Sequence, residues 1–85
     1  MAKQWIEGRL GYNAENDRYG LLVSDLWECD GFHCGERLQI LVEDEWIDTS
    51  MEMDWFAGKG VWYLTETSLK GGMLEGVRVR ISKNV

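Results

Sequence analysis

The sequence has no proline, one histidine and two cysteines among its 85 residues. Two cysteines are too few for the disulfide framework of a small secreted domain, so we expect free thiols in a reducing compartment. A single histidine excludes a metal site built from several histidines. Because proline is absent, the ten glycines are expected to make most of the turns.

Long apolar runs are also missing. The longest aliphatic runs have three residues, for example Leu21-Leu22-Val23 and Ile40-Leu41-Val42. A signal peptide or a transmembrane helix needs a much longer apolar stretch. The sequence therefore predicts a cytoplasmic protein that does not bind membranes.

Basic residues are scarce in the middle of the chain. Residues 19–58 hold ten acids against Arg37 alone, a net charge of −9, whereas residues 59–85 carry +3. The whole chain carries −6, with a pI of about 4.6. An acidic surface repels nucleic acids and anionic membranes and attracts basic proteins. The charge thus predicts a basic protein partner and argues against direct binding to nucleic acid.

Apolar and polar residues alternate along most of the chain, as in half-buried strands. No segment keeps a helical period, and residues 24–32 are the one place with room for a helical turn. The pattern predicts one all-β domain over residues 1–85, a small antiparallel, roughly six-stranded SH3-like barrel or strongly bent meander. A long loop is expected at about 25–36. The six predicted strands are 6–12, 19–24, 37–43, 45–53, 61–66 and 74–81.

The stretch CDGFHCGE, residues 29–36, contains two cysteines, the histidine and two acids, Asp30 and Glu36. Cys29 and Cys34 are five residues apart, a poor spacing for a zinc knuckle, and acidic neighbours should keep both thiols protonated. We interpret the stretch as a shaped connection with Phe32 as an apolar insertion and Cys34 buried before the next strand. A metal- or thiol-dependent activity at Cys29, His33 and Cys34 is an alternative, and no cofactor is expected.

Tryptophan is abundant, with five residues. Trp46 shares a predicted strand face with acids, and Trp27 lies in the predicted loop. Tryptophans either cap the ends of a small barrel or line a binding groove, where they contribute large contact area. An acidic rim would favour lysine or arginine from a partner, including by cation–π contact. The candidate binding residues are Trp27, Phe32, Glu43, Asp44, Trp46, Asp48 and Glu52.

Four segments, GRLGYNAENDRYGL, FHCGERLQILVEDEWIDTSMEM, WYL and LEGVRVRI, resemble a family of short bacterial proteins of unknown function. Its members occur in phages and conjugative elements, and the resemblance covers most of residues 8–81. It implies a recurrent Cys-Gly-Glu turn before a strand, but no known activity. Ser50 departs from the family pattern, which implies arginine there. GERLQILVEDEW more loosely resembles a strand pair of SH3-like barrels, with Glu45 where glycine often stands.

These features predict a small acidic binding module that docks on a basic protein surface. We expect it to be a monomer or weak homodimer and not an enzyme. No phosphate loop, nucleophile elbow or dinucleotide fingerprint is present. The resemblance implies an accessory protein of a phage or conjugative element. In a sharper version it inhibits a nucleic-acid-binding protein by mimicking nucleic-acid charge. A further alternative is nucleic-acid binding through Arg78 and Arg80, which share a strand face.

Overall fold

A computed structural model describes residues 3–84 of the chain, without the side chains of Lys3, Phe56 and Asn84. Seven strands form one antiparallel sheet, and a short 3₁₀ helix, η1 (Gly71–Leu74), precedes the last of them. The strands are β1 (Lys3–Asn13), β2 (Arg18–Val23), β3 (Leu26–Cys29), β4 (Arg37–Val42), β5 (Glu45–Phe56), β6 (Lys59–Leu64) and β7 (Arg78–Asn84).

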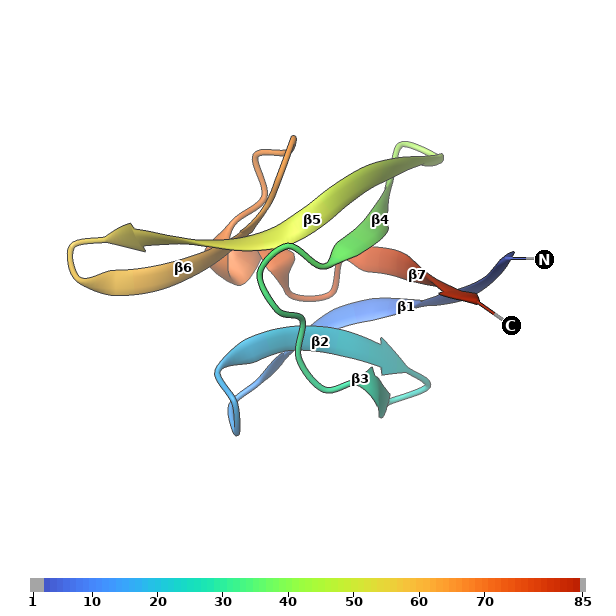
Figure 1. Cartoon of the computed structure of the whole chain (residues 1–85), viewed down its shortest axis with the longest axis horizontal. Helices are drawn as coiled ribbons and strands as arrows, with labels where there is room; N and C mark the ends of the chain where they lie inside the picture. Colours follow the sequence, from blue (N-terminus) through green and yellow to red (C-terminus); the bar gives the residue numbers. More distant parts are fainter. Residues whose placement is uncertain (1–2, 85) are drawn as a thin grey trace.

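The strand order in the sheet is β3-β2-β1-β7-β4-β5-β6. Two three-stranded meanders, β1-β2-β3 and β4-β5-β6, are therefore joined by β7, and the sheet bends so that the meanders face each other (Figure 1). Within residues 3–84, β3 and β6 each pair with a single strand, so the sheet is not closed into a barrel. The all-β antiparallel prediction is confirmed. The predicted barrel is wrong. The alternative, a strongly bent meander, holds within each group of three strands but not for the whole sheet, because β7 lies between β1 and β4.

Tight turns connect the strands within each meander. Both residues of the turns Ser24-Asp25, Glu43-Asp44 and Ala57-Gly58 have positive φ, between 48° and 80°. Such two-residue turns match the right-handed twist of paired strands. The break between the predicted strands 37–43 and 45–53 is thus the hairpin turn of Glu43 and Asp44.

The region predicted as a long loop at 25–36 contains β3, whose residues pair with β2 through a bulge between Leu21 and Leu22. No helical turn forms at residues 24–32, because the Ser24-Asp25 turn returns the chain directly onto β2 as a strand. Of the predicted loop at 25–36, only residues 30–36 lie outside a strand and its turn. The last strand begins at Arg78 instead of residue 74, because η1 occupies residues 71–74.

The hydrophobic core lies between the two facing meanders. Both contribute their inward side chains, and Phe32 and Leu74 enter from outside the strands. None of the helices described within residues 3–84 has the length and apolarity that a membrane span requires. The buried hydrophobic residues are Leu10, Tyr19, Leu21, Phe32, Leu38, Ile40, Met51, Trp62, Leu64, Leu74 and Val79.

Candidate functional site

Residues 30–36, which we call the strap, cross from one meander to the other. The backbone N–H of Phe32 donates to the carbonyl of Tyr19 on β2, at 2.8 Å. At the other end, the N–H of Gly35 donates to the carbonyl of Met51 on β5 at 2.8 Å, and the N–H of Met51 donates to the carbonyl of Glu36 at 3.0 Å. The strap therefore connects the two meanders by backbone hydrogen bonds as well as by the Phe32 ring.

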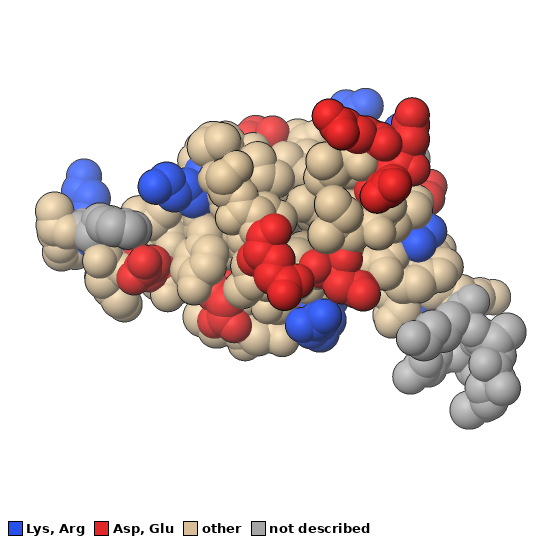
Figure 2. All heavy atoms as spheres, turned by 90° about the horizontal axis from the view of Figure 1, so that it is seen from above, with Lys and Arg blue, Asp and Glu red and all other residues tan. Residues whose placement is uncertain are grey.

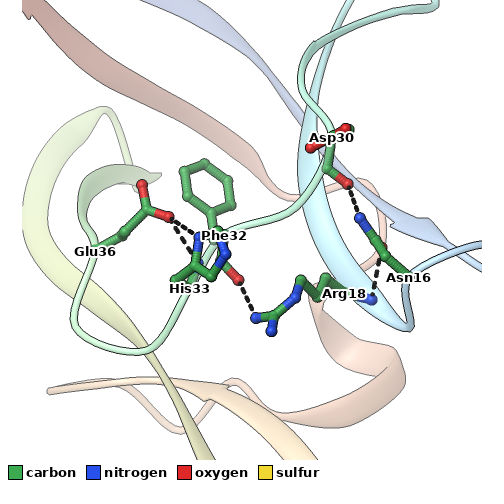
Figure 3. A network of polar contacts seen from close by, with 6 residues as sticks. All are labelled: Asn16, Arg18, Asp30, Phe32, His33 and Glu36. Atoms are coloured by element: carbon green, nitrogen blue, oxygen red, sulfur yellow. Dashed lines mark hydrogen bonds and ion pairs between the residues drawn. The ribbon is translucent and has the colours of Figure 1, made fainter.

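Polar side chains hold the strap in shape (Figure 3). The Asn16 amide donates to the carbonyl of Asp30 at 2.8 Å, and the Arg18 guanidinium donates to the carbonyl of Phe32 at 3.2 Å. The Glu36 carboxylate accepts from the backbone N–H of His33 at 2.7 Å and contacts its Nδ1 at 2.9 Å. The interpretation of this stretch as a shaped connection agrees with this network.

The cysteines and the histidine of the strap region face different environments. Burial raises the pKa of the half-buried Cys29 thiol above its ordinary value, which makes it a weaker nucleophile near neutral pH. Cys34 is exposed, so the prediction that it is buried is wrong. No group of three or more His, Cys, Asp or Glu residues in the described part of the chain could hold a metal ion. The metal or thiol alternative therefore gains no support here.

A shallow hollow of about 870 Å³ lies between β3 and the strap, and we call it the β3 hollow. Four carboxylates line it, no lysine or arginine does, and Trp27, 41% exposed, lies in its wall. This lining attracts a cation both by charge and by the face of the indole ring. The lining residues are Asn13, Glu15, Trp27, Glu28, Cys29, Asp30, Gly31, His33 and Glu36.

The structure divides the predicted binding residues among several places. Phe32 is only 2% exposed, so in this structure its side chain cannot form a binding surface. Four strands separate β3, which carries Trp27, from β5 in the sheet order. Trp46, Asp48 and Glu52 lie on β5, and Glu43 and Asp44 form the preceding turn.

The acidic side chains do not form one continuous surface. On the face that Figure 2 shows, they lie in separate groups, with basic side chains nearby. By position in the fold, one set lies around β3 and the strap, and another lies at the turn between β4 and β5. The strongly acidic middle of the chain thus supplies more than one acidic patch.

Trp46 and Asp48 belong to a network around Arg80. The Arg80 guanidinium carbon lies 4.1 Å from the ring centre of Trp5 and 4.3 Å from that of Trp46. Its Nε donates to the Gln39 side chain at 2.8 Å, and the Gln39 amide donates to Asp48 at 2.7 Å. The sequence predicted that Arg78 and Arg80 share a strand face, but only the strand order places Trp5 against Arg80.

Ser50, where the family resemblance implies arginine, is a packing position in this chain. Its side chain is 7% exposed, and its hydroxyl lies 3.1 Å from the Thr65 hydroxyl. The backbone N–H of Ser50 also donates to the Thr65 hydroxyl, at 3.0 Å. No basic residue therefore contributes to the surface at this point of β5.

Comparisons with known proteins agree with this fold and name no activity. No curated protein sequence matches the chain. The crystal structure of a protein from Ruminococcus gnavus, a target of the Northeast Structural Genomics Consortium, is similar to it with a TM-score of 0.72 and 32% sequence identity. The match covers 89% of this chain and 100% of that chain. Residues 8–81 match the domain of unknown function DUF5348, and the chain belongs to this family.

Proposed function

We propose that the chain is a small, non-enzymatic binding module whose β3 hollow receives lysine or arginine side chains of a basic protein partner. The observation that carries this proposal is the lining of the hollow, in which four carboxylates and Trp27 occur without a basic side chain. A partner's cation would gain Coulomb attraction from the carboxylates and cation–π contact with the indole ring.

Two further features support binding at this place. The outer edge of β3 has no strand partner within residues 3–84, so backbone groups there are available to an extended segment of a partner. The carboxylates are largely exposed, so salt would screen their attraction, and binding should weaken as ionic strength rises.

A sharper form of the proposal is an inhibitor, encoded by a phage or conjugative element, that mimics the charge of nucleic acid. The net charge of −9 over residues 19–58 supports it. A mimic of an extended polyanion would need several acidic patches at once. This form therefore requires the acids at the turn between β4 and β5 as well as those of the β3 hollow, and the plain form requires only the hollow.

A pair of charge-matched variants tests both forms. The hollow variant combines Glu15→Gln, Glu28→Gln and Asp30→Asn, and the control combines E43Q, D44N and E45Q. Each removes three negative charges, and Glu36 is kept because it holds His33 in the strap. The partner is purified with the wild-type protein as bait, and its dissociation constant is then measured by calorimetry at fixed salt.

The hollow variant should bind roughly tenfold more weakly, as expected for the loss of three exposed charge pairs of about 0.5 kcal/mol each. The control should bind like the wild type. An equal loss in both variants would support the charge-mimic form instead. If neither variant changes the dissociation constant, the β3 hollow is not the binding site.

A further inference from the structure

Three arginines stand on the outward face of β1, β4 and β7 without a partner. Arg9, Arg37 and Arg78 are exposed, and none forms a hydrogen bond, ion pair or ring contact with the residues that the structure describes. Arg9 lies directly opposite Arg78 in the register of β1 and β7. Like charges in this position destabilise a sheet, and the carboxylates of Glu7, Asp25 and Glu75, which line a hollow together with Arg9, offset only part of this repulsion because they are exposed.

An accessible aromatic ring lies beside these arginines. Trp5 is 40% exposed on the same face of β1 and is held against Arg80, whose position Gln39 fixes by a hydrogen bond. Trp46 contacts the same guanidinium. The cluster is therefore ordered before any ligand arrives, and Trp5 still offers surface to solvent.

The local charge of this face is opposite to that of the whole molecule. Four arginines (Arg9, Arg37, Arg78 and Arg80) share it with Glu7, which lies opposite Arg80 in the strand register, and with Asp48, which accepts from Gln39. Asp25 and Glu75 line a hollow beside Arg9 at one end of the face. The chain as a whole has fifteen acids and nine bases. An anionic ligand would offset the repulsion between Arg9 and Arg78, and the exposed indole favours a ligand with flat rings.

We infer that this outward face, formed by Trp5, Arg9, Arg37, Arg78 and Arg80, binds single-stranded nucleic acid. Trp5 stacks on an unpaired base, and the unpartnered arginines contact phosphates. A duplex fits less well, because its bases are stacked on each other and cannot reach the indole ring. The net charge of −6 opposes binding at long range, so the affinity is modest and strongly dependent on salt.

Two matched pairs of variants test this inference by fluorescence anisotropy with a labelled oligothymidylate of about ten nucleotides in about 50 mM salt. Trp5→Leu should weaken binding roughly tenfold, the loss of one stacked base. Trp55→Leu is its control, because Trp55 is exposed on the hairpin of β5 and β6. Arg78→Gln should reduce the slope of log affinity against log salt concentration by the amount expected for about one phosphate contact. Its control is Lys59→Gln, which removes one positive charge from the hairpin of β5 and β6 and should leave this slope unchanged.

Arg78→Gln also separates binding from folding. It relieves the repulsion from Arg9, so its melting temperature should equal or exceed that of the wild type while its affinity falls. The inference is overturned if the wild type does not bind the oligonucleotide, or if each control loses as much affinity as its partner variant. It is also overturned if a heparin fragment of similar charge binds as tightly and Trp5→Leu has no effect, since the face would then recognise any polyanion.

Discussion

Phe32 illustrates how one side chain outside the strands joins the two halves of this fold. Its ring is buried between the meanders, and its backbone is held from β2 by Tyr19 and by the Arg18 side chain. The sequence indicated an apolar residue within a polar turn. It could not indicate burial in the core, because that depends on the path of the strap across the bent sheet.

At the residue scale, Phe32→Ala should lower the free energy of unfolding by about 3–5 kcal/mol, because it leaves a cavity between the meanders. Urea unfolding followed by tryptophan fluorescence measures the loss. Leu26→Ala is the control, since Leu26 is 74% exposed on β3 and its removal should change stability by less than about 0.5 kcal/mol. Equal losses in the two variants would show that the strap does not stabilise the core.

At the scale of elements, the turn between β4 and β5 shows what local pattern can and cannot predict. Alternating residues located both strands closely, because their periodicity is local. Glu43 and Asp44 both adopt positive φ. The tight connection between the strands requires this conformation, although it is sterically unfavourable for a residue with a β-carbon. Neither is glycine, so this turn type could not be predicted from the residues of the turn.

Asp44→Gly should therefore raise the free energy of unfolding by roughly 0.5–1 kcal/mol, because glycine adopts positive φ without the steric cost of a β-carbon. Gly58→Ala makes the reverse change and should lower the free energy of unfolding. Gly58 has φ of +80°, and an added β-carbon would meet no atom within 4 Å, so any loss arises from the backbone alone. Thermal unfolding measures both variants, and changes of the same sign would contradict this account.

At the scale of the whole molecule, three groups make stability depend on alkaline pH. The hydrogen bond to Asp17 raises the pKa of Tyr12, and burial raises the pKa of Tyr19 and Cys29. The folded state therefore holds these protons more tightly than the unfolded state. Their contribution to stability is complete below the unfolded pKa values and is lost as pH rises through the folded ones.

The melting temperature should consequently fall as pH rises above the ordinary pKa values of cysteine, about 8.5, and tyrosine, about 10. Tyr19→Phe removes one of them together with its hydrogen bond to the Gly71 carbonyl. Its melting temperature should start lower and decline less steeply than that of the wild type. A parallel decline in the two proteins would exclude Tyr19 as a source of the pH dependence.

The sequence predicted much of the local structure of this molecule and little of its long-range arrangement. Each of the six predicted strands corresponds to an observed one, and β3 was missed because LWEC is too short to show a period. Pairing of β7 with β1 and β4 joins residues far apart in the chain, which no local pattern encodes. For the same reason, the separation of Trp27 from Trp46 and the clustering of arginines around Trp5 required the strand order.

The central place of β7 affects how the protein is made. It is the last strand of the described chain, yet it is the strand that joins the two meanders. During translation, the first six strands leave the ribosome before the segment that unites them, and loops closed over such sequence distances form slowly. The two meanders therefore cannot be united around their shared core until β7 has also left the ribosome.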